Sequence, residues 1–152
     1  MRSATRKVTA LVVCSILMIM AKAAVSPAQT AALPNPVAVF MGQEPYQANG
    51  KDWIRYSYFI ANFEAYPNEL FAAAPALPPC GLNKRASRTW VDFYDSRGKR
   101  LNGFCALGNH DNLGKLWFAL ESDVVPPSWV YIEMTDRQTG NKYKSDIVET
   151  TL

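Results

Sequence analysis

Short runs of aromatic and β-branched residues, separated by Pro, Gly, Asn and Asp, are the feature that most constrains the fold of this chain. Alternate residues of such runs point to opposite faces, as in a β-strand, and no segment shows the periodicity of an amphipathic helix. The pattern predicts an all-β protein. The expected strands are residues 37–42, 53–63, 89–94, 100–106, 116–120, 129–135 and 142–148.

Two turn sequences join neighbouring strands into hairpins. Residues 95–98 begin with Asp and end with Gly, and residues 136–141 end with Gly-Asn; Asp can bond to its own backbone and Gly can adopt positive φ. About seven short strands in a domain of this size predict an antiparallel two-sheet sandwich. The residues expected to face the core are Val91, Phe93, Leu116, Phe118, Leu120, Val130, Ile132 and Met134.

The expected strand 53–63 is apolar on both faces. Its two alternating sets are Ile54, Tyr56, Tyr58 and Ile60 on one side, and Trp53, Phe59 and Phe63 on the other. We expect a strand in the middle of a sheet, with one side on the core and the other partly covered by a loop.

The first 28 residues have the organisation of a secretory signal peptide. A basic start precedes an apolar stretch, residues 8–21, and small residues follow around Ala23 and Ala28. The apolar stretch is shorter than the roughly 20 residues that cross a bilayer, and Cys14 lies inside it rather than at its end, where a lipid would be attached. We therefore predict a secreted or periplasmic protein without a stable membrane anchor, cleaved after Ala23 or Ala28, with Ala28 preferred.

The remaining chain is expected to form a flexible N-terminal arm, residues 29–36, and a single β-sandwich domain, residues 37–152. Four of the 16 basic residues belong to the signal peptide, whereas all 13 acidic residues follow it, so its removal changes the formal charge from +3 to −1. A domain without excess positive charge is poorly suited to neutralising phosphates. Nucleic acid is therefore not an expected partner.

Two cysteines, Cys80 and Cys105, remain after removal of the signal peptide. In an oxidising compartment such a pair forms a disulfide, and its wide separation argues against a redox-active Cys-x-x-Cys site. In the chain-entropy model a closed loop of this length contributes about 3 kcal/mol to stability. The pair is predicted to be a structural bridge.

The segment 127–136, PSWVYIEMTD, is followed by a turn ending in Gly140 and then by Tyr143 and Ser145. It resembles the last hairpin of exported immunoglobulin-like or fibronectin-type-III-like sandwich domains. The segment 80–107, from CGLNK to GFCAL, is similar to uncharacterised bacterial exported proteins. The resemblance implies an immunoglobulin-like sandwich that takes part in interactions, and it transfers no catalytic residue. The chain departs from antibody-type domains because it lacks their Cys-Trp-Cys spacing.

Residues suited to catalysis are sparse. His110 is the only histidine and lies in a polar segment, where we expect it to be exposed and without a role; no Gly-x-Ser-x-Gly motif is present. One His and two bridged Cys cannot complete a transition-metal site. Oxygen ligands at Asp92, Asp95 and residues 109–112 lack the spacing of a calcium loop and are better explained as turn formers. No catalytic residue, metal or cofactor is predicted.

Three carboxylates leave a hydrolase of an extracellular polymer as an alternative. Asp92, Glu121 and Glu133 could meet in space as a catalytic pair. Strand alternation, however, directs Asp92 and Glu133 away from the core.

Five aromatic residues are the candidate binding residues. If the inward sets are correct, more aromatic surface faces outward than a soluble monomer usually exposes. Such faces stack on sugars or anchor protein contacts, unless loops cover them or the strand phase is shifted by one residue. These residues are Trp90, Tyr94, Trp117, Trp129 and Tyr131.

The long connection 64–87 is the second binding candidate. It contains four prolines and is pinned by Cys80, so we expect an ordered surface loop. Together these features predict a non-catalytic exported domain that binds a protein or an envelope glycan. The small carboxylate-dependent hydrolase and a purely structural envelope module are the alternatives.

Overall fold

The computed structural model of the chain describes residues 32–150. The predicted signal peptide and both candidate cleavage positions lie outside these residues. The described part contains eight strands in two antiparallel sheets, which confirms the all-β sandwich. None of its helices is long and apolar enough to cross a membrane.

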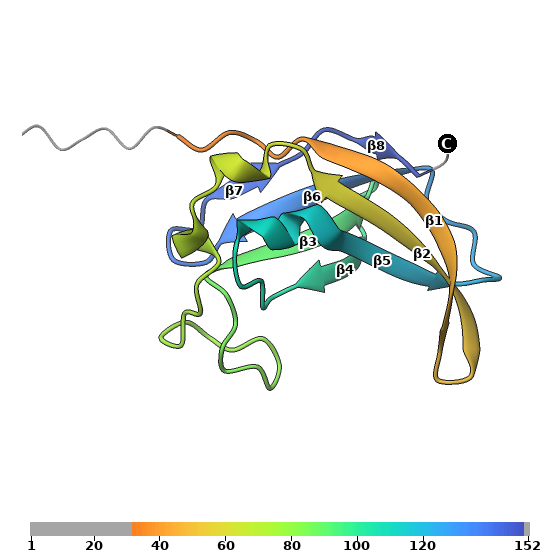
Figure 1. The fold of residues 1–152 in the computed structure, drawn as a ribbon, viewed down its shortest axis with the longest axis horizontal. Helices are drawn as coiled ribbons and strands as arrows, with labels where there is room; N and C mark the ends of the chain where they lie inside the picture. Colours follow the sequence, from red (N-terminus) through yellow and green to blue (C-terminus); the bar gives the residue numbers. More distant parts are fainter. Residues whose placement is uncertain (1–31, 151–152) are drawn as a thin grey trace, which may run out of the picture. The chain divides into compact units, whose positions relative to one another are not determined.

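The two sheets contain three and five strands (Figure 1). The smaller sheet has the order β1-β2-β5, formed by β1 (Ala38–Ala48), β2 (Lys51–Ile60) and β5 (Leu116–Glu121). The larger has the order β4-β3-β6-β7, and β8 also pairs with β6. Its strands are β3 (Thr89–Asp95), β4 (Arg100–Phe104), β6 (Trp129–Asp136), β7 (Lys142–Lys144) and β8 (Val148–Glu149).

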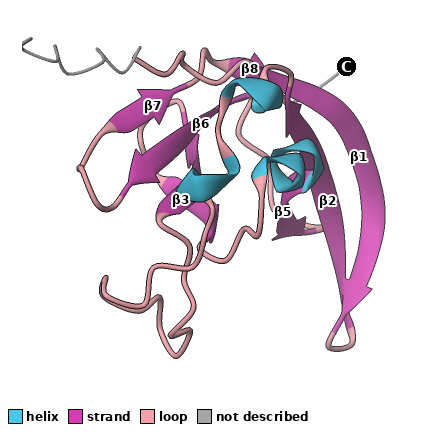
Figure 2. Ribbon diagram, turned by 60° about the vertical axis from the view of Figure 1, so that its left-hand side comes forward, coloured by secondary structure: helices cyan, strands magenta, loops and turns pink. Residues whose placement is uncertain are grey.

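The first hairpin is longer than expected, because β1 continues past Gly42 to Ala48. Its turn is Asn49-Gly50, and both residues have positive φ, 52° and 72°. This combination matches the right-handed twist of paired strands and makes Asn-Gly the strongest short hairpin signal. The register shifts between Phe40 and Gly42, at a β-bulge. Figure 2 shows β1 and β2 as a long curved hairpin whose turn projects away from the other strands.

Two other expected strands have different ends. The strand expected over residues 53–63 ends at Ile60, since the amide of Asn62 accepts the Val37 N–H and donates to the Asn35 carbonyl, leaving Phe63 to begin a 3₁₀ helix. The strand expected over residues 142–148 is divided into β7 and β8. Between them, the hydroxyl of Ser145 accepts the N–H of Ile132 at 2.9 Å, in the place of a ladder carbonyl.

The core forms between the sheets from the predicted inward residues. The side chain of Phe93 lies at its centre, with its ring centroid 5.2 Å from that of Tyr58 and 5.4 Å from that of Phe118. The strand phase is therefore as predicted. The other residues of these sets that are fully buried are Tyr56, Ile60, Val91, Leu116, Val130, Ile132 and Met134, and Ile54 and Leu120 pack against them.

Three 3₁₀ helices, η1 (Phe63–Ala65), η2 (Asn68–Leu70) and η3 (His110–Lys115), interrupt the strands (cyan in Figure 2). The beginning of the 64–87 connection is consequently part of the core, where Tyr66, Leu70 and Phe71 are buried. Burial raises the pKa of Tyr66 to about 12. Its hydroxyl donates to the Pro34 carbonyl at 2.8 Å, so residues of the expected N-terminal arm lie against the domain.

His110 was expected to be exposed, but its side chain is only 25% exposed. Its Nδ1 lies 2.9 Å from the Tyr66 carbonyl oxygen, its backbone N–H donates to the Asn68 side chain, and its ring packs edge-on against Phe63. The exposed-loop interpretation is wrong because η3 packs against η1. The histidine joins these two segments.

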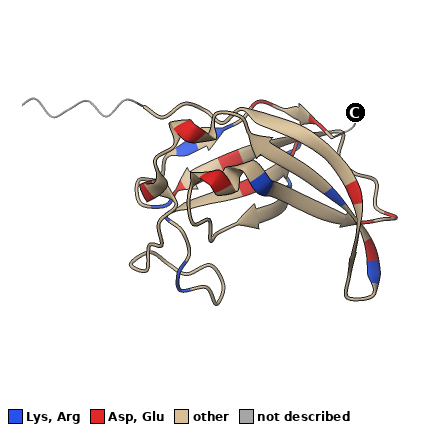
Figure 3. Cartoon of the chain, in the orientation of Figure 1, with Lys and Arg blue, Asp and Glu red and all other residues tan. Residues whose placement is uncertain are grey.

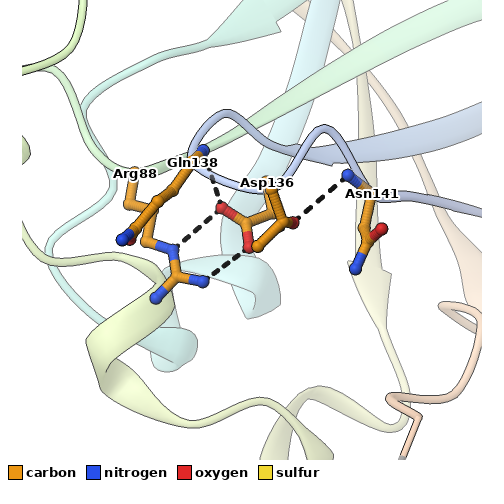
Figure 4. A network of polar contacts seen from close by, with 5 residues as sticks. Arg88, Asp136, Gln138 and Asn141 are labelled. Carbon is orange, nitrogen blue, oxygen red and sulfur yellow. Dashed lines mark hydrogen bonds and ion pairs between the residues drawn. The ribbon is translucent and has the colours of Figure 1, made fainter.

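The remainder of the 64–87 connection is held at its base. Cys80 and Cys105 form the predicted disulfide, with Cα atoms 6.3 Å apart. Figure 4 shows the guanidinium of Arg88 facing the carboxylate of Asp136, which it binds through two hydrogen bonds of 2.8 and 2.6 Å. The side chain of Arg137 donates to the carbonyl of Pro78. The 64–87 connection is thus attached both to the residue that follows β4 and to the turn after β6.

Candidate functional site

The structure separates the five predicted binding aromatics between the two sheets. Trp90, Tyr94, Trp129 and Tyr131 lie on the outward side of β3 and β6, and Trp117 lies on the outward side of β5. Trp129 is exposed, and the other four are half-buried. The aromatics therefore do not form one continuous platform.

We call the outward surface formed by Trp90, Tyr94 and Tyr131 the aromatic face. The rings of Tyr94 and Tyr131 stack on each other, with centroids 5.2 Å apart and planes inclined by 16°. The ammonium of Lys144 lies 3.7 Å from the Tyr131 centroid, and the guanidinium of Arg137 lies 4.2 Å from the Trp90 centroid. These cations occupy ring faces that a sugar would need for stacking. Cations therefore cover Trp90 and Tyr131, while the predicted strand phase is correct.

Two of the three carboxylates considered for hydrolysis lie on the same sheet side. Asp92 and Glu133 are directly opposite each other on β3 and β6. Each is paired with a cation: Asp92 with Arg100 at 2.8 Å, and Glu133 with Lys142 at 2.7 Å. Glu121 is on the other sheet, 2.5 Å from Lys51. The three carboxylates therefore do not converge on a common pocket.

The polar residues considered for calcium form turns and caps. The Asp95 carboxylate accepts the backbone N–H groups of Lys99 and Arg97, both at 2.9 Å. These bonds, with that of Lys99 the strongest, lower its pKa. The Asn112 side chain accepts the N–H groups of Gly108 and Asn109 before η3. Over residues 32–150 no three His, Cys, Asp or Glu side chains are grouped as metal ligands.

A depression of about 460 Å³, which we call the end cleft, lies where β3 turns into β4 and β5 connects to β6. Its basic and polar rim comes from the β3–β4 turn, and its apolar wall comes mainly from the β5–β6 loop. The rim is formed by Asp95, Ser96, Arg97, Lys99 and Ser128, and the wall by Leu101, Leu120, Val124, Val125, Pro126, Pro127 and Trp129.

The wall exposes an unusual amount of apolar surface. Val124, Val125 and Trp129 are 47%, 89% and 44% exposed, and they fall within six residues of one another in the chain. Clustered apolar residues on a surface mark interaction sites more often than isolated ones. Strand alternation predicts Trp129 as a binding residue but does not single out the two valines. Their signal was an apolar Val-Val-Pro-Pro segment without strand alternation, between two expected strands.

The local structure holds the end cleft in shape. Thr150 donates to the carbonyls of Ser128 and Pro127, and the N–H of Ser96 donates to the Trp129 carbonyl at 3.1 Å. Two consecutive prolines further stiffen the loop, since their φ angles are fixed. The wall and the rim are thus attached to each other without help from a ligand.

The rim is positively charged. The carboxylate of Asp95 is used within its own turn, while the Arg97 side chain is 87% exposed and lies 3.5 Å from that carboxylate. This separation is longer than a charge-assisted hydrogen bond, so the exposed guanidinium of Arg97 remains available to a ligand. Lys99 adds a second exposed cation. Figure 3 shows that acidic and basic residues are interspersed along most of the strands.

Comparison with known proteins returns no match: no family model, no curated protein and no solved structure is similar to this chain.

Proposed function

We propose that this chain is a non-catalytic binding domain of a secreted or periplasmic protein, and that the end cleft binds an apolar segment of a partner protein that carries acidic residues. The observation that carries the proposal is the cluster of exposed apolar residues, Val124, Val125 and Trp129, beside a basic rim. The Cys80–Cys105 disulfide supports an oxidising compartment.

The composition of the end cleft resembles that of protein-binding pockets. Aromatic anchors in pockets contribute most of the energy at interfaces, and polar rims add specificity. Trp129 would supply the anchor, and the prolines a preorganised wall that loses little entropy on binding. Arg97 and Lys99 would attract acidic side chains and raise the association rate.

The alternatives receive less support from the same surfaces. The faces of Tyr131 and Trp90 are occupied by Lys144 and Arg137, which disfavours sugar stacking on the aromatic face. The carboxylates Asp92 and Glu133 are paired with cations, which disfavours a hydrolase centred on them. A purely structural module gives no reason for a preformed apolar cleft.

The proposal is tested by selecting random linear peptides against the purified, disulfide-bonded protein. We expect enrichment of peptides that combine an aromatic or long aliphatic residue with Asp or Glu, and their affinity should decrease at high salt. Trp129→Ala and Val125→Ser should each weaken binding at least about tenfold.

A matched control is Leu82→Ala, which removes another fully exposed apolar side chain, on the 64–87 connection. It should leave binding unchanged. Selected peptides that bind equally well to the Trp129→Ala protein, or that lose binding only with Leu82→Ala, would refute a site in the end cleft.

A further inference from the structure

The outward side of the three-stranded sheet carries a second depression, unrelated to the end cleft. Register pairs place Gly42, Ser57 and Trp117 in one row across the sheet, and Glu44, Arg55 and Ala119 in the next. Each row contains small residues: Gly42 and Ser57 in the first, and Ala119 in the second. The larger side chains consequently surround a space instead of filling it.

Two adjoining hollows result, with volumes of about 310 and 280 Å³. Both are lined by Met41, Glu44 and Ser57, so they form one continuous trough. The larger hollow also contains Arg55 and Trp117. The bulge at Gly42 opens the other, since a Cβ at this residue would have no atom within 4 Å. The trough has room for more than one ring-sized group along β1.

Trp117 supplies an accessible aromatic surface in the trough. The guanidinium of Arg55 lies 5.9 Å from its centroid, compared with the 4.2 Å that separates Arg137 from Trp90. Arg55 therefore lies over the Trp117 ring less closely than Arg137 lies over Trp90. Tyr46 and Phe104 hold the indole from the sides, with centroids 6.1 and 6.2 Å away. Of the five predicted aromatics, only Trp117 and Trp129 line a hollow among the described residues, and Trp129 belongs to the end cleft.

The polar groups of the trough retain unused hydrogen-bonding capacity. Arg55 donates from Nε and Nη2 to the same Glu44 oxygen, Oε1, at 2.9 and 2.5 Å. Within the described residues, this leaves Glu44 Oε2, Arg55 Nη1 and the Ser57 hydroxyl without a hydrogen-bond partner. An acceptor, a donor and a hydroxyl that does both therefore surround one aromatic ring.

We propose that this trough binds a neutral oligosaccharide. The apolar C–H face of a pyranose ring stacks on an aromatic side chain, while its hydroxyls each donate and accept hydrogen bonds. Bonds to charged groups such as those of Glu44 and Arg55 are the stronger ones. Glu44 and Arg55 neutralise each other, which leaves Lys115 as the remaining charge that lines the larger hollow. A neutral sugar chain uses the paired groups as hydrogen-bond partners, and an acidic polymer tests whether Lys115 selects a charged ligand instead. The second hollow can hold a neighbouring sugar unit, so an oligosaccharide fits the trough better than a monosaccharide.

The test uses the purified, disulfide-bonded protein and isothermal titration calorimetry with cellohexaose, laminarihexaose, maltohexaose, mannohexaose and chitohexaose, together with polygalacturonate as an acidic comparison. We expect at least one neutral hexamer to bind and to change tryptophan fluorescence. The titrations extend to about 10 mM ligand, which corresponds to a binding free energy of roughly 3 kcal/mol. If no neutral hexamer binds at this concentration, the proposal is overturned. Binding of polygalacturonate alone would also overturn it.

Variants locate the binding. Glu44→Ala removes an exposed side chain, and Ser57→Leu fills the trough with a residue that strands accept. Each variant should lower the affinity for the neutral hexamer at least about tenfold. Trp117→Ala should abolish binding. Because Trp117 contacts Phe104, this variant could fail to fold, and in that case the other two variants provide the test. Trp129→Ala in the end cleft is the matched control and should leave sugar binding unchanged. Sugar binding that survives both Glu44→Ala and Ser57→Leu would refute the assignment.

Discussion

The Arg88–Asp136 ion pair ties the start of β3 to the turn after β6, and we expect its removal to destabilise the domain in a pH-dependent way. The side chain of Asp136 is only 3% exposed, and it accepts bonds from Arg88, Thr139 and the backbone of Gln138. These bonds, that of Arg88 foremost, lower the pKa of Asp136 from 3.8 to about 2.

The magnitude follows from this difference in pKa between the unfolded and the folded chain. The ionised carboxylate contributes about 2 kcal/mol to the free energy of unfolding at neutral pH. Because the folded pKa is the lower one, the contribution is complete above about pH 5 and is lost as the pH falls through 2. The contribution falls to about half of this value at pH 3 and is small at pH 2.

The assay is urea unfolding of the protein and of its Asp136→Asn variant at pH 7, 3 and 2, with Asp146→Asn as a control at an exposed aspartate. The Asp136→Asn variant should lose about 2 kcal/mol at pH 7, about half as much at pH 3 and little at pH 2. The control should lose little at any pH. An equal loss at pH 7 and pH 2 would refute the reasoning, since it would show that the charge of Asp136 contributes nothing.

Three further predictions concern stability. Replacing both Cys80 and Cys105 by Ser should lower the free energy of unfolding by about 3.5 kcal/mol, the loop-closure value for a separation of 25 residues. Chemical denaturation measures this loss, and a value below about 1 kcal/mol would contradict the prediction. Gly50→Ala should lower the free energy of unfolding by about 1 kcal/mol because the φ of Gly50 is 72°, whereas Gly114→Ala should lower it little. Thermal unfolding compares the two variants, and equal losses would exclude the turn as the cause. The hydroxyl of Tyr58 is buried without a hydrogen-bond partner among residues 32–150. Tyr58→Phe should therefore raise the free energy of unfolding by about 1 kcal/mol, as measured by urea unfolding. A loss of stability would show that the hydroxyl has a partner.

Much of the strand architecture could be predicted, because alternation of side chains is a local property of an extended backbone. The inward positions of Val91, Phe93 and Ile132 follow from it directly, and all three are buried. The Asn49-Gly50 hairpin was equally visible in the sequence, and the prediction that the first strand ends at Gly42 overlooked it. The Asn-Gly signal alone predicts a longer first strand, without any knowledge of tertiary contacts.

Other features depend on contacts between distant segments. Tyr66 and Phe71 are buried because the chain after β2 folds onto the edge of the sandwich, and His110 bonds to Tyr66 from 44 residues away. Composition suggested a surface loop there, since a Pro-rich segment with helical turns of three residues has no distinctive period.

The candidate sites show the same division. Trp129 could be named from strand alternation, but its exposure depends on how the β5–β6 loop meets the β3–β4 turn. Trp90 and Tyr131 had the same sequence signal and are covered by Arg137 and Lys144, which come from later parts of the chain. The trough around Trp117 required the register of three strands, because Gly42, Ser57 and Trp117 are adjacent only across the sheet.

The antiparallel strands follow from the amino-acid sequence alone, as do the side of most strands that faces the core and the bridge between Cys80 and Cys105. These properties depend on backbone periodicity, turn chemistry and the number of cysteines, all of which are read along the chain. The availability of each aromatic ring and the positions of the hollows depend on how the strands and loops pack together. Exposure and concavity are properties of side chains that meet from remote positions, and no local pattern specifies those meetings.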